Sequence, residues 1–292
     1  MIRTLFYALV PLLVLLFAAS LASVAGFFIV QVFDGLPVQK IINKSTQVLL
    51  VLCIIPAMAW LKLTKTDLGF AAPKPFLKQL CQGFGLGLVT LLPVFIVLTV
   101  LKINVLDESH AWTLAWFLEK SSIAVLLSLL ISLIEEPLFR GILLAGLLKK
   151  LPVTAAIIIS AAYYACLHFI KTSHNIPAAD LTLSGTFGLL VDAFANLFNP
   201  EILSAFLALL MVGVFLGLLR TGRKVSLGLC IGCHTCWVWL IKMNKTLFNT
   251  DFNADLAFLV SPYDGVIGSL VTGWLLLVVL GYWFWQQRQQ SV

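Results

Sequence analysis

Eight long apolar stretches dominate the sequence, and each is close to the length that a helix needs to cross a lipid bilayer. They lie at about 5–33, 46–63, 79–102, 119–148, 152–170, 202–219, 225–242 and 263–285. In hydrocarbon, every backbone N–H and C=O group must be hydrogen-bonded within the protein, and a helix of roughly 20 residues achieves this across a core of about 30 Å. We therefore predict an all-α, polytopic membrane protein that forms a bundle of about eight transmembrane helices.

The composition indicates a single transmembrane domain over residues 1–292. Hydrophobic residues make up 61% of the chain and charged residues 11%, whereas a soluble domain is about half apolar and about a quarter charged. The net charge of +6 does not indicate nucleic-acid binding, because the basic residues lie in short clusters between apolar runs. The segment 182–198 is more polar and interrupted, which favours a short re-entrant or interfacial helix over a ninth span.

The first apolar run resembles a signal peptide, and Ser23-Val24-Ala25 resembles a cleavage site. However, the run continues to Phe33, far beyond the roughly 7–15 residues of a signal core. We therefore expect an uncleaved first span.

The basic residues predict the orientation of the helices. With the N-terminus inside, the cytoplasmic segments contain Arg3, Lys62, Lys65, Lys74, Lys78, Arg140, Lys149, Lys150, Arg220, Arg223, Lys224 and Arg288. The outside segments contain most of the acids, including Asp34, Asp107, Glu108, Asp180, Asp251 and Asp255. Because Lys and Arg favour the cytoplasmic side, we predict a multi-pass protein of a prokaryotic plasma membrane with both termini in the cytoplasm.

Three of the apolar stretches contain ionisable residues that a membrane disfavours: Glu135, Glu136 and Arg140 in one, Tyr164 and His168 in the next, and His234 in a third. A charge at the bilayer centre costs roughly 2.5–3.5 kcal/mol on insertion scales, so such residues are functional candidates by default. We therefore expect an intramembrane active site built from these residues.

The two glutamates are predicted to have different roles. Glu136 and Arg140 are four residues apart and share a helix face, so they can form an ion pair. Glu135 points about 100° away and is free to project into a cavity. Pro137 has no N–H, so the carbonyl of Leu133 loses its helical donor and the helix should kink. The alternative is that all three charged residues form a juxtamembrane network.

Tyr164 and His168 also share a face, and His234 lies on another span. A lone histidine in an apolar helix is usually a packing residue, but a glutamate and two histidines from three helices can activate water. The glutamate would be the general base, and a histidine would orient the water or stabilise the oxyanion. Basic residues 220–224 are more simply a topology anchor than a substrate clamp.

The cysteines are predicted to pack rather than to hold a cofactor. Cys230, Cys233 and Cys236 recur every three residues, and Cys230 to His234 matches the C-x-x-C-H pattern of haem attachment. That attachment needs an exposed segment on the translocated side, whereas this one begins an apolar span beside a cytoplasmic basic loop. Small apolar cysteines suit a tight helical bundle, and Cys53, Cys81 and Cys166 have the same interpretation.

In this order the motifs resemble the CPBP intramembrane protease family, which includes type II CAAX prenyl endopeptidases and bacteriocin-processing or immunity proteins. That family carries E-E-x-x-x-R, F-x-x-x-H and H-x-x-x-N on successive helices. The motifs here are Glu135-Glu136 with Arg140, Tyr164 with His168, and His234, over about 120–242. The run Gly213–Arg220 also resembles the family's approach to its last motif. One position departs: Val238 stands where the family often has asparagine.

The resemblance implies an endopeptidase that cleaves a membrane-associated peptide or protein, such as a CAAX-type tail, a leader peptide or a sorting tail. Glu135 would activate the water, His168 would assist and His234 would stabilise the intermediate, with Glu136, Arg140 and Tyr164 in support. No metal is expected, since the H-E-x-x-H spacing is absent; a zinc-dependent mechanism would use Glu135, His168 and His234 as ligands.

Two other functions remain open from the sequence. Buried Glu and His residues also form the proton relays of transporters, although the chain shows one helix break and no inverted repeat. The second is a catalytically inert member of the family that acts as a membrane scaffold or immunity protein, and Val238 favours this alternative.

Overall fold

The computed structural model describes residues 2–33, 37–109, 112–172, 174, 176–177, 180–222 and 225–290. The predicted topology residues Asp34, Arg223 and Lys224 lie outside this part of the chain. The helices in it are α1 (Ile2–Val32), α2 (Val38–Leu52), α3 (Ile54–Leu61), α4 (Pro73–Val100), α5 (Leu114–Glu136), π-helix η1 (Pro137–Leu143), α6 (Leu144–Leu148), α7 (Val153–Phe169), α8 (Leu183–Ala195), α9 (Leu203–Thr221), α10 (Leu227–Leu247) and α11 (Ser269–Gln290), with 3-10 turns at Asn196–Phe198, Pro200–Ile202 and Ala257–Leu259. Strands β1 (Asn104–Leu106) and β2 (Phe248–Thr250) pair antiparallel, with Val105 opposite Asn249.

The structure is an all-α membrane fold. Five helical stretches among the described residues are long and apolar enough to cross a bilayer: Tyr7–Val32, Val38–Leu61, Pro73–Val100, Leu114–Leu148 and Pro200–Thr221. The other predicted spans correspond to α7, which is apolar but shorter, to α11, whose apolar stretch Ser269–Phe284 is also shorter, and to α10, which carries Lys242 and Lys245 near its end. The count of eight crossings therefore stays a prediction.

Two helices, α2 and α11, begin at other residues than the apolar runs predicted, because a helix can start before or after the point where the sequence becomes apolar. The second span was expected from 46, but α2 begins at Val38, because a helix that starts after Pro37 continues through the polar residues Gln39, Lys40, Asn43 and Lys44. The last span was expected from 263, but α11 begins at Ser269, and the preceding residues form a turn in which Asp264 accepts bonds from the N–H groups of Val266 and Ile267.

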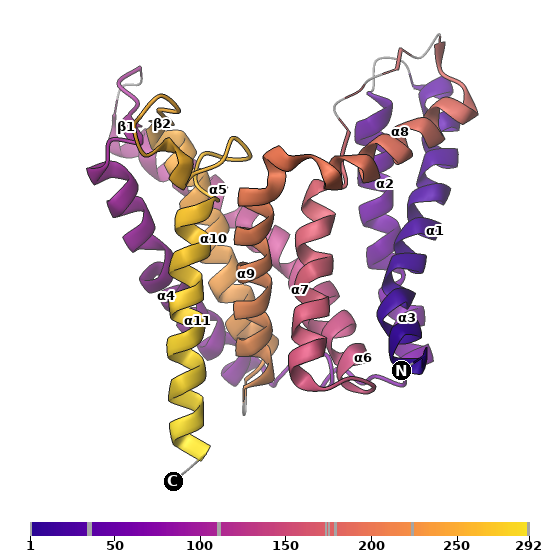
Figure 1. The fold of residues 1–292 in the computed structure, drawn as a ribbon, viewed down its shortest axis with the longest axis horizontal. Helices are drawn as coiled ribbons and strands as arrows, with labels where there is room; N and C mark the ends of the chain where they lie inside the picture. Colours follow the sequence, from indigo (N-terminus) through magenta and orange to yellow (C-terminus); the bar gives the residue numbers. More distant parts are fainter. Residues whose placement is uncertain are drawn as a thin grey trace.

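The polar segment 182–198 forms the short helix α8. Its first turn is capped by Thr182, whose Oγ1 accepts a hydrogen bond from the Gly185 N–H at 3.0 Å. Figure 1 shows that α8 lies obliquely across one end of the bundle, between α7 and α9 in the chain, and reaches α1. A short helix is therefore present where the sequence predicted one, and its re-entrant or interfacial position in the membrane stays a prediction.

The closest helix contact joins α4 to α10 through glycines. A Cβ atom on Gly83 or Gly87 of α4 would collide with the backbone of α10, and one on Gly228 or Gly232 would collide with the backbone of α4. Both pairs have the spacing G-x-x-x-G, which lets helices in a membrane approach closely. The contact holds α10, and with it His234, at a fixed distance from α4.

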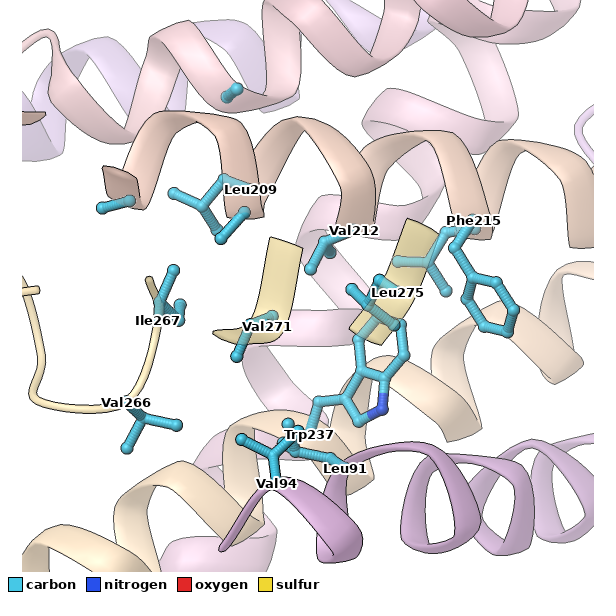
Figure 2. Packing of buried hydrophobic residues seen from close by; sticks show 14 of the residues in the cluster. Leu91, Val94, Leu209, Val212, Phe215, Trp237, Val266, Ile267, Val271 and Leu275 are labelled. Carbon is cyan, nitrogen blue, oxygen red and sulfur yellow. The ribbon is translucent and has the colours of Figure 1, made fainter. Parts of the chain in front are cut away.

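The main apolar core lies between α4, α9, α10 and α11. Figure 2 shows Leu91 and Val94 of α4 close to Trp237 of α10, with Leu209, Val212 and Phe215 of α9 across from them. Trp237 is fixed by its Nε1–H, which donates to Thr90 Oγ1 at 2.8 Å. This packing forms one wall of the cavity described below.

The loops that were predicted to be cytoplasmic and the loops that were predicted to be outside lie at opposite ends of the bundle. The described ends of α1 and α11 near the termini share one end with the α3–α4, α6–α7 and α9–α10 connections (Figure 1). The β1–β2 pair and α8 lie at the other end. Which end faces the cytoplasm stays a prediction from charge alone.

Candidate active site

Four of the six candidate residues line one cavity of ≈ 430 Å³. Glu135 reaches it from the last turn of α5, Tyr164 and His168 from α7, and His234 from α10. The wall is apolar and includes Leu91, Val212, Trp237 and Leu275. The structure therefore brings together residues that are separated by up to about a hundred positions in the chain.

Glu136 and Arg140 lie beside this cavity and form the predicted ion pair. Arg140 Nη1 lies 3.1 Å from Glu136 Oε1, and the two residues are 1% and 0% exposed. The same Oε1 atom lies 2.8 Å from Nδ1 of His234. This second contact was not predicted, since no spacing rule links residues 98 positions apart. Glu136 thus holds His234 as well as Arg140.

Glu135 differs from its neighbour in being open to the cavity. Its side chain is 27% exposed, and its Oε2 atom lies 3.9 Å from Nε2 of His234. That oxygen and Oε2 of Glu136 are both buried and have no hydrogen-bond partner in the described part of the chain. The two glutamates therefore differ in the exposure of their side chains, and the partly exposed carboxylate of Glu135 is the one that can accept a bond from water or from a substrate.

Both histidines present the same ring nitrogen to the protein. His168 Nδ1 lies 2.7 Å from the Tyr164 carbonyl oxygen, which only accepts hydrogen bonds, and His234 Nδ1 faces the Glu136 carboxylate. Each Nδ1 therefore carries the hydrogen, and each Nε2 is the ring nitrogen that can contact water or substrate.

The break at Pro137 takes the form of a π-helix of seven residues rather than a simple kink. The backbone freed by this turn is partly bonded by α7, because Ser160 Oγ donates to the Phe139 carbonyl at 3.2 Å. Arg140 lies on the same turn with its Cζ 4.4 Å from the Tyr164 ring centroid, and Phe139 meets that ring edge-on at 5.1 Å. The turn thus fixes Arg140 against α7. Short π-turns of this kind often occur at functional sites.

Comparison with protein families gives a match at this segment. Residues 117–240, somewhat less than half of the chain, match the family described as "Type II CAAX prenyl endopeptidase Rce1-like". The segment is Rce1-like. The resemblance predicted from the motifs is confirmed, and it supports membrane endopeptidase activity in general. No curated protein and no solved structure gave a significant match.

The Rce1-like segment contains Val238, and the structure places this side chain on the cavity wall. Position 238 is one helical turn beyond His234, so an amide there would face the same space. Valine gives no hydrogen bond, and the cavity therefore lacks this donor.

The same segment contains the three clustered cysteines, which are all fully buried free thiols. Cys236 packs against Gly87 of α4, and Cys230 Sγ lies 3.6 Å from the Leu216 carbonyl of α9. In the described part of the chain, no group of three His, Cys, Asp or Glu side chains is arranged to hold a metal ion. Neither the cysteines nor Glu135, His168 and His234 fit a ligand set, so we draw no step through a metal.

Arg220 lies away from the cavity, at the end of α9. Its Nη2 donates to the Asp67 carbonyl at 2.8 Å in the α3–α4 connection. This contact fastens a loop at the bundle end opposite β1–β2, in agreement with an anchor rather than a substrate clamp.

Sequence reasoning missed five polar residues of the cavity, namely Lys171, Lys242, Lys245, Tyr263 and Asp264. A signal for two of them was present: Lys242 and Lys245 follow His234 by 8 and 11 positions and share its helix face. Outside the spans, burial and the nearby Lys245 lower the pKa of Lys171. Burial raises the pKa of Asp264 and raises the pKa of Tyr263 to about 12.

Proposed function

We propose that the chain is an intramembrane endopeptidase that hydrolyses a peptide bond of a membrane-associated substrate with water activated by Glu135. The family match supports the reaction class. The observation that carries the assignment is the difference between the two glutamates: the Glu136 side chain is fully buried in an ion pair, whereas the Glu135 side chain is 27% exposed and lines the cavity.

In the proposed mechanism, Glu135 accepts a proton from water while the oxygen attacks the scissile carbonyl. Glu135 then returns that proton to the leaving amine, which balances the reaction without a cofactor. General-base catalysis of this kind contributes about 10²–10⁴-fold. His168, with Nε2 available, orients the water, and Tyr164 holds His168 through its backbone carbonyl.

His234 stabilises the oxyanion through its Nε2–H. Because Nδ1 already donates to Glu136, Nε2 can donate only when the ring is protonated. Without an amide at Val238, this histidine carries more of the oxyanion charge than it would with that amide.

The test is Glu135→Gln, which nearly keeps the side-chain volume but cannot act as a base. Native membrane proteins would be compared by mass spectrometry of their termini in cells with the parent and with this variant. We expect new termini only with the parent, and a loss of cleavage by the purified variant of at least about 10²-fold.

The matched control is Glu119→Gln, an exposed glutamate on the same helix α5, which should cleave like the parent. Equal cleavage by the parent and Glu135→Gln would refute the assignment of the base. Absence of cleavage by any form would favour the inert alternative that Val238 raises.

A further inference from the structure

Three lysines lie on the cavity that contains Glu135, His168 and His234. Lys171 follows the end of α7, and Lys242 and Lys245 belong to the last turns of α10. Lys171 and Lys245 are exposed and Lys242 is half-buried, whereas Tyr164 and His234 are buried. The lysines therefore lie at the solvent-accessible entrance, and the catalytic candidates lie deeper.

The charge of these lysines is only partly compensated in the part of the chain that the structure describes, where Lys245 acts on the Asp264 carboxylate without a close ion pair. None of them forms an ion pair there within 4.0 Å, and Lys171 Nζ lies instead 4.6 Å from the ring centroid of Tyr263. Asp264 is the carboxylate at this entrance, and its Oδ1 already accepts from Val266 and Ile267. Burial and, to a smaller extent, the positive charge of Lys245 lower the pKa of Lys171.

The orientation predicted from charge does not account for these lysines. The bias of basic residues towards the cytoplasm explains those at the opposite end of the bundle. Lys171 and Lys245 lie at the end that contains β1–β2 and acids such as Asp107 and Asp251. Like charges placed together at a cavity entrance disfavour one another unless an anion joins them.

The helix gives the spacing between the lysines and the reacting centre. Lys242 and Lys245 follow His234 by 8 and 11 positions, which corresponds to about 12 and about 16 Å along α10 at 1.5 Å per residue. An extended peptide advances about 3.3 Å per residue. A substrate segment of about four or five residues therefore reaches from His234 to the lysines.

We propose that Lys171, Lys242 and Lys245 form an anion site that binds a carboxylate of the substrate about four or five residues from the scissile bond. This inference rests on the proposed function and names its substrate class: peptides with an acidic group near the cleavage site. The carboxylate is either a free C-terminus or an Asp or Glu side chain, because ammonium groups bind both as point charges.

Binding can be measured without cleavage. The probe is a set of synthetic peptides with an uncharged dye, each made with a C-terminal acid or amide and with Glu or Gln five residues from either end. Fluorescence anisotropy would report their affinity for the purified Glu135→Gln protein in detergent. We expect at least one acidic peptide to bind about tenfold or more tightly than its neutral partner, and the favoured member identifies which carboxylate is bound.

We expect the preference for acidic peptides to be lost in a triple variant with Lys171→Gln, Lys242→Gln and Lys245→Gln. A triple variant with arginine at the same three positions should keep that preference. The control is Lys102→Gln, which changes an exposed lysine at the same end of the bundle but outside the cavity.

The single change Lys245→Gln, at an exposed position, decides the question if the triple variant does not fold. Equal binding of acidic and neutral peptides, or a preference that survives loss of the lysines, would overturn the proposal. Cleavage by Glu135→Gln would refute only the assignment of Glu135 as the base, since binding still decides the lysine site.

Discussion

Two adjacent glutamates of α5 have different surroundings because of one helical step of about 100°. Glu136 is fully buried against Arg140 and His234, so its charge is already compensated. Glu135 is partly exposed and lines the cavity. Exchange of their roles would need the helix to rotate, which the Ser160 bond to the following turn opposes.

Glu136→Gln and Arg140→Gln should each destabilise the protein by about 3–5 kcal/mol, because each leaves a buried charge without its partner. The double variant should cost clearly less than the sum of the two, as expected for residues in contact. Thermal unfolding in detergent would measure this difference. Strictly additive losses would show that the two side chains do not act as a pair.

At the scale of helices, the α4–α10 contact determines where His234 can lie. Gly83→Ala should destabilise the protein by about 1–3 kcal/mol, because its new Cβ would collide with the Leu229 carbonyl and the helices would have to separate. Gly85→Ala is the matched control on the same helix, since nothing lies within 4 Å of its Cβ position. Unfolding curves in which both variants match the parent would contradict the close contact.

The cysteines of α10 pack against α4, through Cys233 and Cys236, and against α9, through Cys230, and they should matter for packing alone. Cys230→Ala, Cys233→Ala and Cys236→Ala should each cost about 1 kcal/mol and leave the rate per folded molecule nearly unchanged. Elemental analysis of the purified parent and of the triple variant checks this. About one zinc or iron per chain that disappears in the triple variant would make the cysteines ligands instead.

At the scale of the whole molecule, the charges predict that the cavity opens away from the cytoplasm, because its lysine entrance lies at the β1–β2 end. On a cysteine-free background, Lys149→Cys should react with a membrane-impermeant thiol reagent only after the membrane is opened, whereas Asp255→Cys should react in intact cells. The reverse pattern would invert the orientation and place the entrance on the cytoplasmic side.

The sequence predicted what depends on local spacing. The long helices follow from apolar runs, and the Glu136–Arg140 pair follows from a separation of four. The Glu136–His234 bond and the entrance lysines did not follow, because tertiary packing brings them together. The start of α2 was missed for a different reason: hydropathy locates lipid-exposed segments, whereas a helix continues into water as long as its backbone bonds are made.

The π-turn at Pro137–Leu143 has a consequence for how this chain tolerates change in length. Its wider turn sets the phase between α5, which carries the glutamates, and α6, whose Leu144 and Leu147 pack in a separate cluster. A π-turn closes i→i+5 bonds and therefore holds one residue more than the α-helical turn that it replaces. Loss of one residue here would let the segment close into a regular α-helix with α5 and α6 nearly in their present phase. Loss of a second residue would have no wide turn to absorb it, so it would rotate one half against the other by about 100° and carry the glutamates out of the cavity although every side chain of the site was retained.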